Sequence, residues 1–128
     1  MSEKTKILVV DDDSGIGEML KTLLEFYGFE VTVTELPDSA ESIIAEKQIE
    51  VVMLDMLISG VNGTDVCSRL RNNKETENIP ILMMSALHNA GDKCKKAGAD
   101  DFIAKPFEMD ELISKIREIV EKRKNSVS

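Results

Sequence analysis

Five polar side chains in this sequence stand at or just after the ends of short apolar runs. They are Asp11, Asp12, Asp55, Ser85 and Lys105. Carboxylates that lie close together repel one another, and oxygen ligands without His or Cys suit Mg²⁺ or Mn²⁺ better than Zn²⁺. A lysine and a hydroxyl beside such a metal suit an anion with several oxygens, and a carboxylate can act as a nucleophile. If the five groups converge, they form a site for phosphoryl transfer.

Convergence requires a fold that brings the ends of distant strands together. Residues 51–54 are apolar without alternation, which is typical of a strand buried on both faces of a parallel sheet. Similar runs cover residues 7–10, 79–84 and 102–103, whereas residues 29–33 alternate with polar residues and are expected nearer an edge. Parallel strands that are covered on both faces bind ligands beyond their carboxyl ends, which is where the polar residues stand.

Helices are predicted between the strands from apolar residues at helical spacing. Ser14 is expected to cap the first helix, Asp38 and Glu41 to form a capping box in the second, and Asn62 to cap the third. A short fourth helix is expected over residues 89–97. The apolar face of the first helix consists of Ile16, Met19, Leu20, Leu23, Leu24 and Tyr27. The apolar face of the last consists of Leu112, Ile113, Ile116, Ile119 and Val120.

Strands alternating regularly with helices predict an α/β fold, with a five-stranded parallel sheet covered by five helices on both faces and right-handed crossovers. A chain of 128 residues is expected to be one domain, 1–128, with its core in residues 5–122 and a polar tail at 123–128. The formal net charge of −8 argues against direct nucleic-acid binding, which depends on neutralising phosphates.

The composition also predicts a cytoplasmic location. No apolar run approaches the roughly 20 residues that cross a membrane. The first six residues lead straight into a predicted strand, so no signal peptide is expected. Cys67 and Cys94 lack the spacing of a metal site, and we interpret them as small packing residues in a reducing compartment.

One motif is similar to a dinucleotide-binding fingerprint, but the sequence does not complete it. Gly15-Ile16-Gly17 follows a strand and opens a helix, as a dinucleotide fingerprint does. The third glycine is missing because position 20 is Leu, and three aspartates precede the motif where a pyrophosphate would approach. A dinucleotide site is therefore not expected.

Taken in order, the motifs resemble those of the bacterial two-component response-regulator receiver domain, of the single-domain chemotaxis type. The resemblance covers residues 5–122 and depends on five motifs. They are Val9-Val10-Asp11-Asp12, Asp55, Gly63 eight residues later, Ser85-Ala86 and Lys105-Pro106-Phe107. It implies a flavodoxin-like doubly wound fold with strand order 2-1-3-4-5.

The resemblance also implies roles for the site residues. Asp55 would accept a phosphoryl group from the phosphohistidine of a histidine kinase or phosphotransfer protein. Mg²⁺, with Mn²⁺ as an alternative, would be held by Asp12, Asp55 and the backbone carbonyl of Leu57, with Asp11 acting mainly through water. Lys105 and Ser85 would contact the phosphoryl oxygens.

The resemblance further implies a phosphorylation switch rather than an enzyme with an external substrate. Phe102 falls at the family's aromatic switch position. The face formed by the fourth helix, fifth strand and last helix would bind an output partner, with a phosphorylation-dependent dimer as a further expectation. Leu57 and Leu87 flank the site and cannot orient an attacking water, so we expect slow self-dephosphorylation. Ile58-Ser59 replaces the Met-Pro pair frequent in the family, which should loosen this loop.

Other readings of the same residues remain open at this point. An aspartyl-phosphate phosphatase of the haloacid-dehalogenase type would need a second aspartate where Leu57 stands, and a cap domain. A receiver-like binding module that is never phosphorylated would not need the full acidic set. Ser85 could instead cap a helix, Phe102 could be ordinary core, and Asp13 and His88 are interpreted as solvated neighbours without a role in the site.

Overall fold

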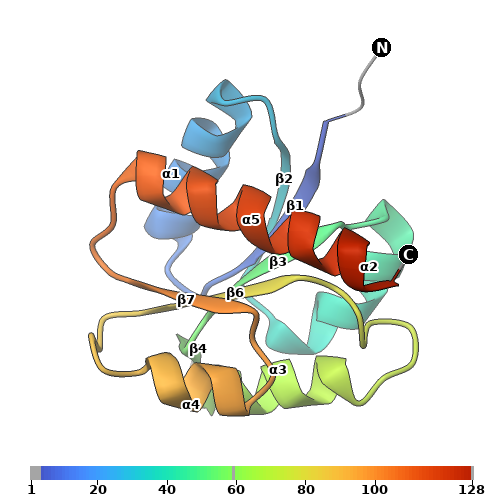
Figure 1. The fold of residues 1–128 in the computed structure, drawn as a ribbon. Helices are drawn as coiled ribbons and strands as arrows, with labels where there is room; N and C mark the ends of the chain where they lie inside the picture. The colour runs from blue at the N-terminus through green and yellow to red at the C-terminus, as the bar shows by residue number, and fades with distance from the viewer. Residues whose placement is uncertain (1–3, 59, 128) are drawn as a thin grey trace.

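The computed structural model describes residues 4–58 and 60–127, and within them five parallel strands form the central sheet (Figure 1). The strands are β1 (Lys6–Val10), β2 (Glu30–Thr34), β3 (Val51–Asp55), β6 (Ile81–Ser85) and β7 (Asp101–Ala104). Their order across the sheet is β2-β1-β3-β6-β7, so the predicted order 2-1-3-4-5 is confirmed. The alternating strand β2 lies at an edge, as expected.

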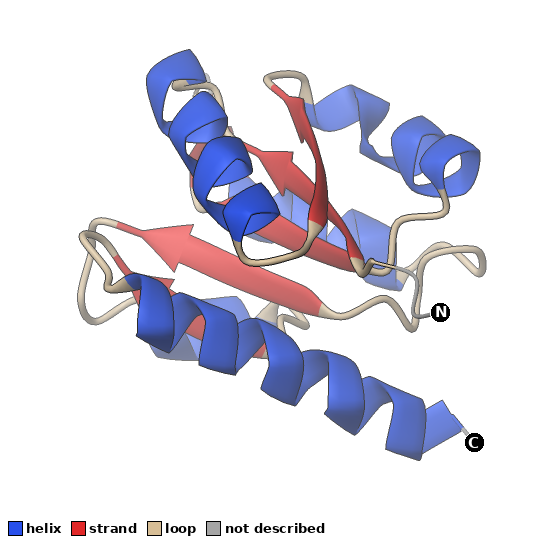
Figure 2. Ribbon diagram, turned by 90° about the horizontal axis from the view of Figure 1, so that it is seen from above, coloured by secondary structure: helices blue, strands red, loops and turns tan. Residues whose placement is uncertain are grey.

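Helices cover both faces of this sheet (Figures 1 and 2). They are α1 (Ser14–Phe26), the 3₁₀ turn η1 (Pro37–Ser39), α2 (Ala40–Lys47), α3 (Gly63–Arg71), α4 (Gly91–Lys96) and α5 (Met109–Val127). Buried residues of α1 and α5 pack in one apolar cluster, and those of α2, α3 and α4 pack in a second cluster. Figure 2 shows α5 as the long helix that ends at the C-terminus, running beside the sheet.

The strand β3 explains why its terminal carboxylate lies where it does. Val51 and Met53 face the α1–α5 side, whereas Val52 and Leu54 face the α2–α4 side, and all four side chains are fully buried. An unpaired charge in either layer would lose its hydration, so Asp55 is accommodated only at the end of the strand.

The cap of α1 differs from the expected one, and the cap of α3 agrees with it. Asp13, not Ser14, caps α1, because its Oδ1 accepts a hydrogen bond of 3.1 Å from the backbone N–H of Ile16. Asn62 caps α3 as predicted, accepting a hydrogen bond from Thr64 N. Asp13 is exposed to solvent, as expected, and it also caps α1. Met19 lies at the margin of the predicted α1 face and is half exposed.

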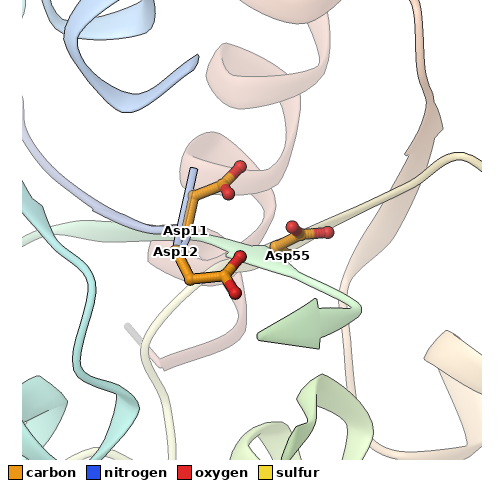
Figure 3. A group of neighbouring side chains, drawn as sticks. All are labelled: Asp11, Asp12 and Asp55. Atoms are coloured by element: carbon orange, nitrogen blue, oxygen red, sulfur yellow. The ribbon is translucent and has the colours of Figure 1, made fainter. Parts of the chain in front are cut away.

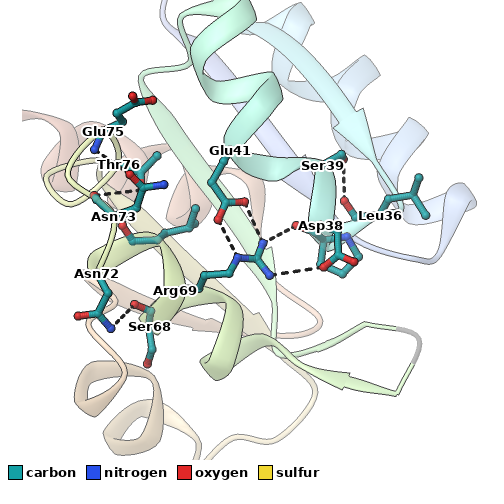
Figure 4. A network of polar contacts seen from close by, with 12 residues as sticks. Leu36, Asp38, Ser39, Glu41, Ser68, Arg69, Asn72, Asn73, Glu75 and Thr76 are labelled. Carbon is teal, nitrogen blue, oxygen red and sulfur yellow. Dashed lines mark hydrogen bonds and ion pairs between the residues drawn. The ribbon is translucent and has the colours of Figure 1, made fainter.

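The expected capping box of Asp38 and Glu41 is wrong. Glu41 instead accepts two hydrogen bonds from the guanidinium of Arg69, at 2.7 and 3.0 Å (Figure 4). The same guanidinium donates to the backbone carbonyl of Pro37 and lies 3.5 Å from Asp38. Arg69 thus joins α3 to the η1–α2 segment, and a long-range ion pair has replaced the local cap.

The segment expected as a loop after β3 contains a small antiparallel hairpin. Its strands are β4 (Leu57–Ile58) and β5 (Val61–Asn62), and Gly60 between them has φ of +80°. Such a φ favours glycine. Ser59, where the family often has proline, lies outside the described residues.

A second ionic network anchors α5. Asp100 accepts a hydrogen bond from Arg71 of α3 at 2.7 Å and another from Arg123 of α5 at 2.6 Å. The next residue, Asp101, lies 3.2 Å from Lys115 of α5. The side chains of Asp100 and Arg71 are only 13% and 14% exposed, so these bonds are partly shielded from water.

The C-terminal helix is longer than expected. α5 continues to Val127, into the residues predicted as a polar tail, because Glu121 to Lys124 are good helix formers. Among the described residues, no helix combines the length and apolar character needed to cross a bilayer. Cys67 and Cys94 are free and buried in the α2–α4 cluster, as predicted, and burial raises the pKa of the Cys67 thiol to about 11.

Candidate functional site

Three carboxylates from two strands meet at the carboxyl edge of the sheet. Asp11 and Asp12 follow β1, and Asp55 ends β3, the neighbouring parallel strand. One oxygen from each of the three lies within 4.8 Å of the others (Figure 3). The predicted convergence of the acidic residues is therefore present in the structure.

Lys105 lies between two of these carboxylates. Its Nζ is 3.3 Å from Asp11 Oδ2 and 3.4 Å from Asp55 Oδ2. The backbone N–H of Lys105 donates to the carbonyl of Ser85 at 2.7 Å, which extends the pairing of β6 with β7 up to the site. The Lys105 ammonium thus pairs with two of the three carboxylates of the cluster, Asp11 and Asp55.

Burial is the main influence on the pKa of Asp55. Burial raises the pKa of Asp55, and the nearby Asp11 carboxylate raises it further. The Lys105 ammonium and a backbone hydrogen bond from Leu57 act in the opposite direction, but the net pKa shift is upward. A cation bound beside Asp55 would lower the pKa of Asp55, because an opposite charge favours the ionised form.

The carboxylate opens into a cavity of about 700 Å³. The lining residues are Asp55, Met56, Leu57, Gly60, Asn62, Ser85, Ala86, Leu87 and Lys105. Ser85 is only 4% exposed, and its Oγ accepts a hydrogen bond of 2.9 Å from the backbone N–H of Leu87. This hydroxyl therefore shapes the turn after β6 and does not cap α4, whose N-cap is Ala90.

Gly63 packs closely against the backbone of Asp55. Its backbone N–H donates to the carbonyl of Met56 at 2.6 Å, and a Cβ at this position would overlap the backbone carbonyl of Asp55. Only glycine allows the hairpin to return this close to β3. The motif pointed to Gly63, but its contact with Asp55 could not be read from the sequence.

Two predicted site residues keep roles that the geometry does not test. Leu57 lies in β4 with its side chain exposed into the cavity, and its carbonyl as a metal ligand stays a prediction. Phe102 is partly buried against the α2–α4 cluster, and a Cβ on Gly91 of α4 would lie 3.7 Å from its ring. The ring is thus placed between the sheet and the start of α4.

The donor set suits a divalent cation. Asp11, Asp12 and Asp55 offer carboxylate oxygens and no nitrogen or sulfur, and hard cations prefer oxygen ligands. A bound dication would add positive charge beside these carboxylates, as the Lys105 ammonium does beside Asp11 and Asp55. The residues present therefore fit such an ion on charge and on ligand type.

Fold and site together define a doubly wound α/β domain with an acidic pocket at the carboxyl ends of its central strands. The response regulator receiver domain family matches residues 7–117, and the chain belongs to this family.

Individual relatives agree with this assignment. The chain is 35% identical to the phosphate regulon transcriptional regulatory protein PhoB of Rhizobium meliloti over 124 residues, which cover 95% of this chain and 55% of that protein. A putative response regulator from Chloroflexus aurantiacus has a TM-score of 0.86 and 32% identity, with 93% of this chain and 99% of that chain covered. A CheY-like receiver domain protein from Methanospirillum hungatei has a TM-score of 0.84 and 26% identity, with 97% and 99% covered.

The curated relatives are longer than this chain, which spans about half the length of those it matches. Their names are those of transcriptional regulators and DNA-binding response regulators. The family match supports the receiver over the haloacid-dehalogenase alternative.

Proposed function

We propose that this receiver domain is a phosphorylation switch in which Asp55 accepts a phosphoryl group from the phosphohistidine of a histidine kinase or phosphotransfer protein. The observation that carries the proposal is the position of Lys105, whose ammonium lies within 3.4 Å of both Asp11 and Asp55 at a cavity large enough for a phosphoryl group. A surface lysine without this role would not need to lie between two carboxylates.

The residues divide the work of the transfer. An Asp55 oxygen forms a bond to phosphorus as the phosphorus–nitrogen bond of the donor phosphohistidine breaks, and the bonding pair returns to the imidazole, which leaves. Lys105 donates to a phosphoryl oxygen as negative charge develops there. Ser85 can donate its hydroxyl hydrogen to another oxygen while it keeps the bond from Leu87 N–H, because a hydroxyl both donates and accepts. Mg²⁺, or Mn²⁺ in its place, would be held by Asp12, Asp55 and the backbone carbonyl of Leu57, with Asp11 acting mainly through water. The ion would supply positive charge that lets carboxylates and phosphoryl oxygens approach.

Phosphorylation of Asp55 would change the shape of the face formed by α4, β7 and α5. Ser85 ends β6 and pairs with Ala104 of β7, so a shift of Ser85 toward the phosphoryl group moves the strand that carries Phe102. The Phe102 ring borders Gly91 of α4, and its movement would change how α4 sits on the sheet. This face would bind the output partner or a second copy of the chain, with a coupling free energy of about 1–3 kcal/mol.

The lifetime of the acyl phosphate should be long. Leu57 and Leu87 line the cavity, and neither can hold a water in line with the phosphorus–oxygen bond. Replacing them together, by Leu57→Asn with Leu87→Glu, should accelerate loss of the phosphoryl group by roughly 100-fold, the lower end of the range for positioned acid–base groups. An unchanged rate of hydrolysis would show that these positions do not control the lifetime.

Intact mass spectrometry with acetyl phosphate and Mg²⁺ tests the proposed function. We expect one phosphoryl adduct on the natural sequence and none on Asp55→Asn. Glu35→Gln, which removes an exposed carboxylate from the turn after β2, should keep the adduct. If the natural sequence gives no adduct with any donor, the chain is a receiver-like binding module and not a phosphoacceptor.

A further inference from the structure

Asn62 and Gly63 form the junction between β5 and α3. In an asparagine–glycine pair the backbone nitrogen of the glycine can attack the side-chain amide of the asparagine, because glycine has no side chain that hinders the approach. Asn62 is exposed to solvent, so base and water can reach it. The junction thus combines the cap of α3 with two residues that can react with each other.

We propose that Asn62–Gly63 is a deamidation site that the fold restrains, and that its isoaspartyl product disables the phosphoacceptor. The first half of the proposal concerns the chain by itself. The second half rests on the proposed function, because it concerns the phosphorylation of Asp55.

The modification needs only base and water. Base removes the proton of Gly63 N, this nitrogen bonds to Asn62 Cγ, and the side-chain nitrogen takes up a proton and leaves as ammonia. Water then opens the resulting five-membered succinimide ring. Addition of water to the side-chain carbonyl gives an ordinary aspartate. Addition to the main-chain carbonyl gives an isoaspartate, in which the main chain runs through Cβ and is longer by one atom.

Hydrogen bonds hold the two reacting groups apart in the folded chain. Gly63 N–H donates to the carbonyl of Met56 at 2.6 Å, which keeps the proton on the attacking nitrogen. Asn62 Oδ1 accepts from Thr64 N at 3.0 Å and from Thr64 Oγ1 at 2.7 Å, which fixes the side-chain amide over the start of α3. Deamidation therefore requires the junction to open.

The backbone angle of Asn62 also opposes the reaction. The five-membered ring needs Asn62 Cβ and Gly63 N on the same side of the Cα–C bond, which for an L-residue means a strongly negative ψ. Asn62 has a ψ of 119°, the extended conformation that suits a helix cap. Rotation to the reactive angle would move Gly63 away from the backbone of Asp55, against which it is packed.

The strength of these bonds sets how far the fold slows the reaction. One hydrogen bond contributes a net factor of roughly five to the equilibrium between the closed and the open junction. The three bonds from Gly63 N, Thr64 N and Thr64 Oγ1 together correspond to deamidation about 100-fold slower in the folded chain than in the unfolded chain. Loss of the Thr64 hydroxyl alone should increase the rate in the folded chain about fivefold.

The two products differ in what they do to the acceptor. An ordinary aspartate keeps the length of the main chain and is as good a helix cap as asparagine. An isoaspartate adds a main-chain atom directly before Gly63, at a point so close-packed that even a Cβ would overlap the Asp55 carbonyl. The isoaspartyl chain therefore loses the contact that positions the backbone of Asp55.

The first experiment measures deamidation of Asn62 in the full chain by peptide mass spectrometry, at mildly alkaline pH, with and without urea. Methylation by a protein isoaspartate methyltransferase with S-adenosylmethionine quantifies the isoaspartyl product. Thr64→Ala removes one hydrogen bond to Asn62, and Thr64→Ser keeps the hydroxyl. Thr22→Ala is the matched control, because it removes a hydroxyl from an exposed position on α1.

We expect Asn62 to deamidate about 100-fold faster in urea than in buffer. Thr64→Ala should increase the rate about fivefold in buffer and leave it unchanged in urea, whereas Thr64→Ser and Thr22→Ala should keep the natural rate in both. Equal rates in urea and in buffer, or no deamidation of Asn62 in urea, would refute the restrained site. An equal acceleration by Thr22→Ala would show that the cap of α3 is not the restraint.

The second experiment tests the consequence for phosphorylation. Isoaspartyl chains are separated from aged protein by ion-exchange chromatography and treated with acetyl phosphate and Mg²⁺ beside Asn62→Asp, which represents the ordinary aspartyl product. We expect an adduct on Asn62→Asp and none on the isoaspartyl chains in the time that the natural sequence needs. An adduct formed at the natural rate on the isoaspartyl chains would refute the inactivation and leave the deamidation site standing. If fresh natural sequence gives no adduct, the proposed function and the inactivation both fail, while the deamidation rates still decide the first half.

Discussion

Replacing Asp55 by asparagine should stabilise the metal-free protein. The side chain of Asp55 is only 13% exposed, and it lies among two like charges and one opposite charge. Each neighbouring carboxylate has an oxygen within 4.8 Å, where the repulsion is at least about 3.5 kcal/mol with an effective dielectric constant of 20. Attraction to Lys105 at 3.4 Å is about 5 kcal/mol on the same scale. The two repulsions exceed this attraction by at least about 2 kcal/mol.

The expected gain is therefore about 1–2 kcal/mol in the free energy of unfolding, since solvent at the mouth of the site weakens each interaction. For a domain of this size the melting temperature should rise by about 4–7 °C. Urea unfolding in EDTA at pH 7 measures the change. Glu35→Gln removes the same charge from an exposed turn and should stay within about 0.5 kcal/mol of the natural sequence.

Added Mg²⁺ should reverse the order of stability. A ligand present at 100 times its dissociation constant stabilises the protein that binds it by about 2.7 kcal/mol, and Asp55→Asn should gain much less. The pH dependence has a definite sign as well. Because the pKa of Asp55 is raised in the folded protein, the penalty of its charge appears as pH rises through that pKa. The advantage of the asparagine variant should thus shrink on acidification. A metal-free variant less stable than the natural sequence would refute the proposed charge surplus.

Three further changes test the site and its support. Asp12→Asn should also stabilise the metal-free fold, by about 1 kcal/mol, while weakening the stabilisation by Mg²⁺; a destabilised metal-free variant in the same urea assay would count against the cluster. Gly63→Ala should cost about 2–3 kcal/mol and slow phosphorylation, because the new methyl group would overlap the Asp55 carbonyl; unchanged urea midpoint and rate would contradict that packing. Glu41→Gln should cost about 1 kcal/mol at pH 7, measured by urea unfolding, because it weakens the bidentate pair with Arg69.

The Glu41 effect should depend on pH. Burial raises the pKa of Glu41, but the hydrogen bonds from Arg69, a backbone hydrogen bond and the positive charge of Arg69 together lower it more, so the net shift is downward. A carboxylate with a lowered pKa stabilises the fold above its ordinary pKa and loses that contribution as pH falls through the folded value. The difference between Glu41→Gln and the natural sequence should thus disappear in acid. A difference that persists at pH 3 would show that the ion pair is not its source.

The ends of the strands could be predicted from the sequence because a strand buried on both faces is an uninterrupted run of apolar residues. A run such as Val51 to Leu54 has to be covered on both faces, and the sheet edge then fixes where Asp55, Ser85 and Lys105 meet. The hairpin of β4 and β5 gives no comparable signal, since each strand has only two residues. Local pattern alone could not show that it would form.

Polar contacts between residues far apart in the chain could not be predicted from the sequence either. Arg69 lies 28 residues from Glu41, and Arg71 lies 29 residues from Asp100, so no helical or strand periodicity relates either pair. Glu41 looked like a capping residue because its spacing from Asp38 fits that motif. In the folded chain Glu41 accepts two hydrogen bonds from the guanidinium of Arg69 instead. Two charge-assisted hydrogen bonds are more stabilising than the single bond of a local cap.

The pairing of α5 with Asp100 and Asp101 bears on which parts of the output face can move. Arg123 and Lys115 lie eight residues apart on α5, about 12 Å along its axis, yet they bond to two consecutive residues, Asp100 just before β7 and Asp101 at its start. Sliding the helix along its axis would stretch one of these ion pairs as it relaxed the other. A change of the proposed output face that keeps both ion pairs therefore has to leave α5 in its place along this axis.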